Sequence, residues 1–192
     1  MAIIDRLLGE THDLDVQTGE EARAVLAGSE DTYRQWLART YGFVAPLEAA
    51  LSDVSELSDF VDSRRFRKHE LLRRDLEALS AHAYGLATCT KMPVFEGVQD
   101  ALGWAFVIER AALGHNVLFR GLATSLPREA AFASSYLKCY FGAIGEMWRG
   151  FVESLELASA QPHHAERLIA AAKRAVDCYC EWSRAAVPVA NP

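Results

Sequence analysis

Apolar residues recur three or four positions apart along most of this chain, which is the spacing of an amphipathic α-helix. No convincing run of alternating β-branched residues interrupts that pattern. The dipeptides Asn-Gly and Asp-Gly, which are typical of tight β-hairpins, do not occur. The pattern therefore predicts an all-α protein.

Six segments carry the helical pattern, at about 2–16, 30–52, 66–80, 95–123, 133–159 and 163–186. A loop around 85–93 and a linker with a short helix at 125–132 separate some of them. We expect Thr18-Gly19 to interrupt the first segment and Ser29 to cap the second. Pro46 should kink the second segment or end it early, and Pro162 should stand near the start of the last.

The segment 95–123 is apolar on most of its sides, which is typical of a buried helix. Its most apolar stretch, 101–108, has only eight residues before Glu109 and Arg110. A helix needs roughly 20 apolar residues to span a bilayer. The first residues also lack the pattern of a secretory signal. We therefore expect a soluble, cytoplasmic protein with no membrane partner.

Composition adds the domain organisation and excludes some partners. The 192 residues contain no internal repeat, low-complexity tract or interdomain linker, which predicts one domain over 1–192 with a frayed end at 187–192. The net charge of −6 argues against a nucleic-acid partner. Four cysteines lack the spacing of a zinc site, and we expect reduced thiols; they are Cys89, Cys139, Cys178 and Cys180.

Motifs for nucleophilic or phosphate chemistry are absent from the sequence. Pairs such as His12 with Asp15 are too scattered to predict a carboxylate-bridged metal site. A basic run at 64–74 most simply forms a solvated helix face, and the alternative is an edge that faces ligand carboxylates or an acidic partner. The run consists of Arg64, Arg65, Arg67, Lys68, Arg73 and Arg74.

The stretch GWAFVIERAALGH, residues 103–115, is the most informative part of the chain. Gly103 and Gly114 lie inside a segment that should be a buried helix, where each glycine costs up to about 1 kcal/mol. A glycine is tolerated there when something approaches the backbone closely. That neighbour is either a second helix or a flat ligand.

At this stretch the chain resembles the bacterial haem oxygenases, especially the branch associated with bacteriophytochromes. Their distal-helix pattern, Gly-x-Leu-Tyr-Val-Leu-Glu-Gly-Ser-x-Leu-Gly-Gly, is matched in register by residues 103–115. The segments YRQWLARTYGFVAPLEAAL (33–51), LLRRDLEAL (71–79) and MWRGFVESLE (147–156) are also similar to the family. The resemblance implies a multi-helical single domain that holds haem between a proximal and a distal helix and opens it to biliverdin, CO and iron with external electrons.

The proximal family pattern, Leu-x-x-x-Thr-x-x-x-His, matches Thr11 but places Asp15 where the iron-ligating histidine should stand. The spacing from that position to Tyr33 agrees with the family without a gap. A carboxylate is a poor haem ligand beside imidazole. His12, about one turn away, is the alternative iron ligand, and otherwise a surface residue.

On the distal segment the resemblance puts Arg110 and His115 at two glycine positions and retains Gly114. Arg110 has three interpretations, because a buried charge needs a partner. It pairs with Asp15 across an emptied pocket, it faces the carboxylate of another ligand, or it leaves His115 to ligate iron from the distal side. For His115 itself we favour a place on the outer face of the helix.

Arg149 is similar in position to a basic residue near the haem edge in the family, and would there meet a ligand carboxylate or else be exposed. Trp148 and Phe151 we assign to the core. The sequence thus predicts a haem-oxygenase-like protein with a degenerate haem site. The alternatives are an active oxygenase that uses His12 or His115 and an electron donor, and a module that binds a tetrapyrrole or a protein partner.

Overall fold

The computed structural model describes residues 2–81 and 83–185, and these contain helices and no strand. The elements are α1 (Ile3–Glu10), α2 (His12–Ala27), α3 (Glu30–Ser52), the 3-10 helices η1 (Ser55–Asp59) and η2 (Ser63–Phe66), α4 (Lys68–Ala78), α5 (Val98–Ala112), α6 (His115–Ser125), α7 (Pro127–Phe132), α8 (Ile144–Ala158) and α9 (Pro162–Arg184). The all-α prediction is confirmed. The expected fraying at 187–192 lies outside the described residues.

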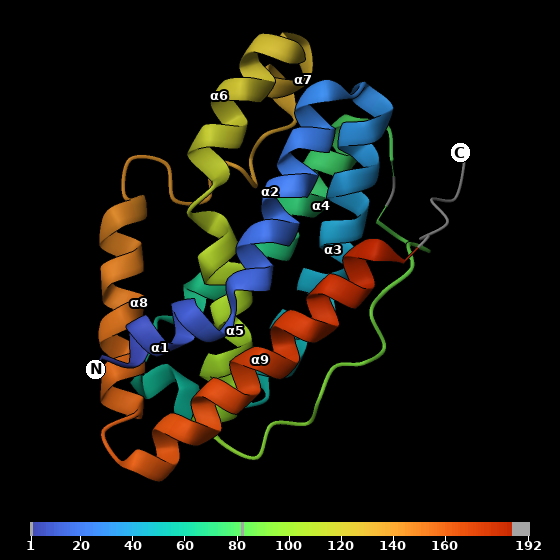
Figure 1. Ribbon diagram of the computed structural model, residues 1–192. Helices are drawn as coiled ribbons and strands as arrows, with labels where there is room; N and C mark the ends of the chain where they lie inside the picture. Colours follow the sequence, from blue (N-terminus) through green and yellow to red (C-terminus); the bar gives the residue numbers. More distant parts are fainter. Residues whose placement is uncertain (1, 82, 186–192) are drawn as a thin grey trace.

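Helix α5 runs through the middle of the molecule and packs most extensively on α9 (Figure 1). Most of its residues are buried, as the apolar pattern predicted. Gly103 permits the close approach, because a Cβ there would lie 2.6 Å from the Leu168 carbonyl oxygen and 2.7 Å from the Ala171 Cβ. The neighbour that approaches Gly103 closely is therefore a second helix, α9, and not a flat ligand.

The break near the N-terminus falls at Thr11, and the prediction of a break at Thr18-Gly19 is wrong. Thr11 leaves helical geometry at φ −124° and ψ 26°, and its buried hydroxyl donates to the Leu7 carbonyl. Helix α2 then continues without interruption. Thr18 fits the helix because its hydroxyl donates to the Leu14 carbonyl one turn back, 2.9 Å away.

Helix α3 begins at Glu30 and is capped by Ser29, as predicted; the side chains of Ser29 and Thr32 form a reciprocal capping box. Pro46 does not end this helix, which continues to Ser52. Proline lacks the N–H that would bond to the carbonyl of Gly42. That carbonyl instead accepts from the Cys89 backbone N–H at 2.8 Å, so the loop after α4 supplies the missing hydrogen bond.

Two further boundaries differ from the prediction. The central segment breaks at Leu113–Gly114, where the backbone makes the shorter i→i−3 hydrogen bonds before α6 begins. The segment predicted as a helix at 133–159 instead has turns over 134–143, and α8 begins only at Ile144. There both Asp75 carboxylate oxygens accept backbone N–H groups, from Ser135 and Tyr136, at 2.8 Å. A side chain of α4 thus replaces the helical bonds that this segment lacks.

All four cysteines are free thiols, as predicted, and Cys89 and Cys178 bring their Sγ atoms within 3.6 Å. Along the described residues, no helix combines the length and apolarity that crossing a membrane requires.

The packing at Gly103 predicts a cost for any added side chain. Gly103→Ala should lower the free energy of unfolding by about 1–3 kcal/mol, because backbone atoms of α9 occupy the space of the new Cβ. Gly9→Ala is the matched control, since a Cβ there meets nothing within 4 Å. Urea unfolding measures both. Equal stability of the two variants would contradict this account of the α5–α9 contact.

Candidate functional site

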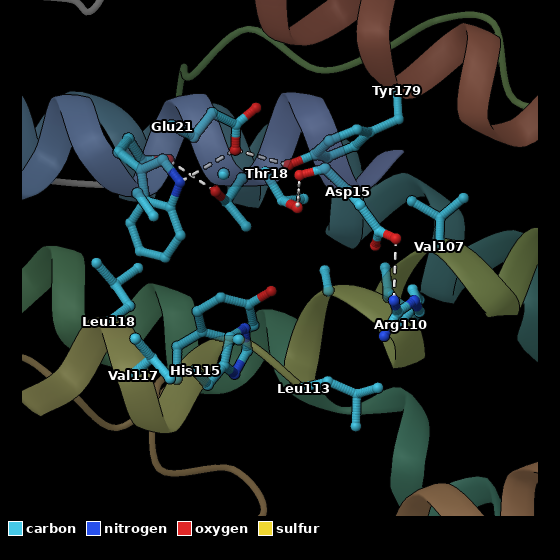
Figure 2. Close-up of a pocket in the computed structure, with 18 of the residues that line it drawn as sticks. Asp15, Thr18, Glu21, Val107, Arg110, Leu113, His115, Val117, Leu118 and Tyr179 are labelled. Atoms are coloured by element: carbon cyan, nitrogen blue, oxygen red, sulfur yellow. Dashed lines mark hydrogen bonds and ion pairs between the residues drawn. The ribbon is translucent and has the colours of Figure 1, made fainter. Parts of the chain in front are cut away.

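A cavity of about 430 Å³ lies between α2 and α3 on one side and the α5–α6 junction on the other (Figure 2). Its walls are mainly apolar and aromatic, and Trp36, Tyr136 and Tyr179 all contribute rings to it. The sequence resemblance placed a ligand between these same two helical segments. The cavity is therefore the candidate functional site.

Arg110 and Asp15 form an ion pair across this cavity, with the Arg110 Nη2 atom 3.0 Å from the Asp15 Oδ2 atom. The first interpretation of Arg110 thus matches the geometry. The pair is not buried, however, because the side chains are 24% and 40% exposed. The guanidinium also lies 5.9 Å from the centre of the Trp148 ring. A pair this exposed contributes at most about 1 kcal/mol, so it joins the cavity walls only weakly.

His12 stands on the first turn of α2, exposed to solvent, and is not among the residues that line the cavity. The α2 wall is instead formed by side chains such as Asp15, Thr18 and Ala22. Within the part of the chain that the structure describes, α2 therefore brings no imidazole to the cavity. Ligation by His12 stays a sequence prediction that this geometry does not support.

His115 lies inside the protein, and the prediction that it faces outward is wrong. It is 4% exposed, lines the cavity, and packs against the Tyr136 ring with a centroid distance of 4.5 Å. The break at Leu113–Gly114 starts a new helix at His115, so the face expected from one continuous helix no longer applies. Burial lowers the pKa of His115 to about 3, and the cation of Lys68 contributes to that decrease. The imidazole is therefore neutral at physiological pH.

Two glycines leave open space at the cavity. A Cβ on Gly114 would meet only the Ala111 carbonyl oxygen at 3.6 Å, and one on Gly19 in the opposite wall would meet only the Arg23 side chain at 3.7 Å. Gly114 thus differs from Gly103, which packs against a helix. The backbone at Gly114 is available for close approach by a ligand.

Glu21 lines the cavity from α2 and was missed in the sequence. Its carboxylate accepts hydrogen bonds from Tyr179 at 2.8 Å and Trp36 at 3.3 Å (Figure 2). The Gln17 side chain donates to it as well, at 3.1 Å. These donors come from three helices, and helical periodicity alone does not bring them together. Their hydrogen bonds hold Glu21 and both aromatic side chains in fixed positions on the wall.

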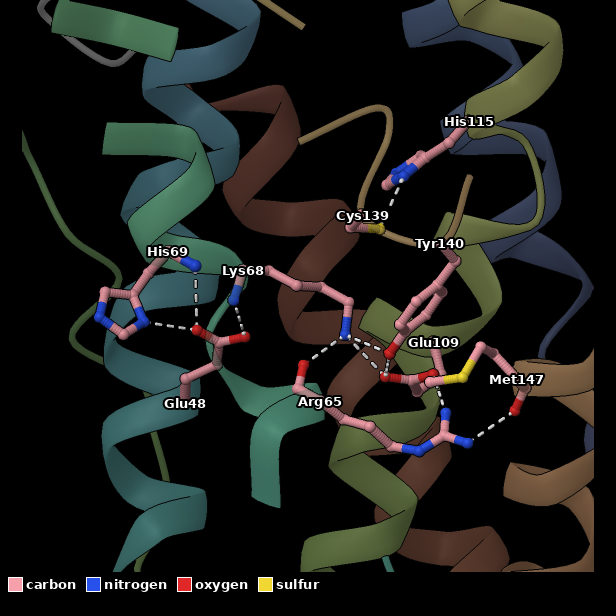
Figure 3. Close-up of polar contacts among 9 residues, drawn as sticks. All are labelled: Glu48, Arg65, Lys68, His69, Glu109, His115, Cys139, Tyr140 and Met147. Atoms are coloured by element: carbon pink, nitrogen blue, oxygen red, sulfur yellow. Dashed lines mark hydrogen bonds and ion pairs between the residues drawn. The ribbon is translucent and has the colours of Figure 1, made fainter. Parts of the chain in front are cut away.

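Behind the cavity, Glu109 of α5 carries a buried negative charge that two cations neutralise (Figure 3). Its carboxylate lies 2.7 Å from the Lys68 ammonium and 3.0 Å from the Arg65 guanidinium. The Tyr140 hydroxyl donates to it at 2.8 Å, and Arg65 also donates to the Met147 carbonyl at 2.9 Å. The neighbouring carboxylate raises the pKa of Lys68 against the opposing effect of its burial.

This cluster corrects both interpretations of the basic run at 64–74 for two of its residues, while the others are exposed as a solvated face predicts. Arg65 and Lys68 do not face solvent, since their side chains are 9% and 3% exposed. Their charges are also not available to a ligand, because both bind Glu109. Three others form exposed pairs within their own segment: Arg64 with Asp62, Arg67 with Glu70, and Arg73 with Glu77. A partner from α5 could not be assigned from spacing within the run.

Glu48 of α3 holds the start of α4. Its two carboxylate oxygens accept the backbone N–H groups of Lys68 at 2.9 Å and His69 at 3.0 Å, and one also contacts the His69 ring at 2.6 Å (Figure 3). A carboxylate is favourable at the positive end of a helix. It therefore fixes the segment from which Lys68 reaches Glu109.

The remaining predicted residues lie outside the cavity. Arg149 is exposed on α8, and its role toward a ligand carboxylate stays a prediction. Phe151 is fully buried and Trp148 packs partly buried against the core, as predicted. Over the described residues, no group of three or more His, Cys, Asp or Glu side chains is placed to hold a metal ion.

The buried and exposed ion pairs predict very different costs of mutation. Glu109→Ala leaves two buried cations without a carboxylate and should destabilise the protein by about 3–5 kcal/mol. Glu70→Ala removes an exposed partner of Arg67 and should cost less than about 1 kcal/mol. Chemical unfolding compares them. A small loss for Glu109→Ala would show that the cluster does not hold α5.

The low pKa of buried His115 predicts that the free energy of unfolding decreases in mild acid. Its pKa is near 6.5 in the unfolded chain and about 3 in the folded one, so the unfolded state binds a proton first as pH falls. The stability that neutral His115 confers is complete above pH 6.5 and is lost as pH falls toward 3. His115→Leu should flatten this part of the profile. Thermal unfolding at pH 7.5 and pH 5 tests it, and parallel profiles for both proteins would refute it.

Comparison with known proteins identifies the family and a solved structure with a similar fold. The model of the haem oxygenase family matches residues 11–185. The fold is similar to the crystal structures of NO- and CO-bound haem oxygenase from Neisseria meningitidis, with a TM-score of 0.80 and 21% identity over 96% of this chain and 91% of that chain. No curated protein matches the sequence. Because the family match spans most of the chain, this protein belongs to the haem oxygenase family.

Proposed function

We propose that this protein binds haem, or a closely related flat tetrapyrrole, without opening it by the family's route. The observation that carries the proposal is the ion pair between Asp15 and Arg110. It joins the two walls that would enclose the ligand, at the two positions where the sequence resemblance predicts an iron-ligating histidine and a distal glycine.

Part of the cavity fits a flat apolar ligand. Aromatic and aliphatic side chains dominate its walls, and Gly19 and Gly114 leave space on opposite sides. When bound, haem supplies the iron at which the family activates oxygen. Here the α2 wall offers that iron a carboxylate already held by Arg110, so the proximal position does not fit the family's chemistry.

The Asp15–Arg110 pair can give way to a ligand at small cost. Both side chains are partly exposed, so each regains water when the pair opens. Arg110 would then be free to meet an acidic group of the ligand at the mouth of the cavity. This combines the first two interpretations of Arg110: a pair with Asp15 when the cavity is empty, and a contact with a ligand carboxylate when it is filled.

An active oxygenase that uses His12 is the less supported alternative. The His12 side chain is exposed and lies outside the cavity lining. For His12 to reach the cavity, α2 would have to rotate or slide. That movement would pull Leu14 and Gln17 out of the core, where both are buried. We therefore do not assign His12 a role in turnover.

Hemin titration followed by reduction tests the proposal. The protein should bind hemin with a saturable Soret band and, with ascorbate in air, should form no biliverdin. The double change Asp15→His with Arg110→Gly should restore the family's ligand and distal space, and raise hemin affinity by roughly tenfold, the equivalent of about 1.4 kcal/mol. Visible absorption spectra report both binding and product.

The matched control replaces an exposed ion pair away from the cavity, Lys91→Gly with Glu181→His, whose partners are 69% and 63% exposed. It should leave hemin affinity unchanged. Absence of saturable hemin binding by the unaltered protein would refute the binding proposal. Rapid biliverdin formation by the unaltered protein would refute the loss of turnover.

A further inference from the structure

We infer that haem bound in this cavity is ligated by His115, from the α5–α6 wall, and not from α2. This inference rests on the proposed function and concerns the same cavity. In the family, the resemblance implies, the iron-ligating histidine comes from the proximal helix, which corresponds to α2. Here it would come from the opposite side of the haem.

His115 has the chemistry that an iron ligand requires. It is 4% exposed, and it lines the cavity directly after Gly114. Neutral imidazole is the form that binds metals. Within the part of the chain that the structure describes, His115 contributes the one imidazole among the cavity-lining side chains.

The Cys139 thiol lies beside one ring nitrogen of His115, and the Tyr136 backbone also hydrogen-bonds to the imidazole. Its Nδ1 atom lies 3.6 Å from the Cys139 Sγ atom (Figure 3). Metal-bound histidines commonly use their second nitrogen for a hydrogen bond that orients the ring. We assign Nε2 to iron because Nδ1 is the ring nitrogen that faces Cys139.

The segment that positions His115 is itself anchored. Tyr136, whose ring packs on His115, donates its backbone N–H to buried Asp75 at 2.8 Å. Tyr140, next to Cys139, donates its hydroxyl to Glu109 at 2.8 Å. Two buried carboxylates thus hold both ends of the short segment against which the imidazole rests.

Among the described residues, α2 contributes no imidazole to the opposite wall of the cavity. Asp15 is held by Arg110, and Glu21 is held by three neutral donors from Gln17, Trp36 and Tyr179. Both are carboxylates, which are weaker partners for haem iron than imidazole. The contrast between the two walls assigns the iron ligand to the α5–α6 side.

The test compares hemin complexes of the unaltered protein, His115→Gly and His12→Gly. The ferrous complex of the unaltered protein should show the iron–histidine stretching band in resonance Raman spectra. His115→Gly should abolish the band and weaken hemin binding at least tenfold, and added imidazole should restore an imidazole-ligated spectrum. His12→Gly should behave like the unaltered protein, because that side chain is exposed.

A second substitution guards against loss of the fold. His115→Gln keeps a polar side chain in the buried site but ligates iron poorly, and circular dichroism checks the folding of both variants. An iron–histidine band that survives in either folded variant, or disappears in His12→Gly, would overturn the assignment of His115. Hemin binding that none of these changes affects would also overturn it, while leaving the proposed function intact. No saturable hemin binding by the unaltered protein would overturn both.

Discussion

The charge of Glu109 is the constraint on which the position of the distal wall depends. A carboxylate buried in the middle of α5 is tolerated because Arg65, Lys68 and Tyr140 all contact it. Sliding α5 along its neighbours would leave these groups without partners, at a cost of several kcal/mol. The cluster thus fixes α5 relative to the start of α4 and to the turns over 134–143, and the cavity wall follows from that arrangement.

The ion pairs made by two adjacent residues of α5, Glu109 and Arg110, have opposite physical consequences. Glu109 is enclosed, and its partners cannot exchange protein contacts for water. Its neighbour Arg110 pairs with Asp15 at the mouth of the cavity, where water competes with the contact. A rigid wall and an adjustable mouth therefore arise from adjacent residues on one helix. That combination suits a cavity that admits a ligand without rearranging its core.

Membership in the haem oxygenase family sets the fold and leaves the chemistry to particular side chains. Where the resemblance predicts an imidazole from α2, the cavity wall carries Asp15, while His115 brings an imidazole to the other wall. The break at Leu113–Gly114 is what turns His115 inward, because α6 starts a new helix there. A short irregularity in the backbone thus decides on which side of the cavity an imidazole stands.

The sequence by itself determined the all-α class and the cap at Ser29, since each depends on spacing along the chain. Tertiary structure decided the rest. Pro46 stays within α3 because Cys89 bonds the carbonyl that it frees, and Lys68 is buried because Glu109 meets it. Periodicity shows which face of a helix is apolar, but a charge or a carbonyl is satisfied by whichever group the fold places about 3 Å away.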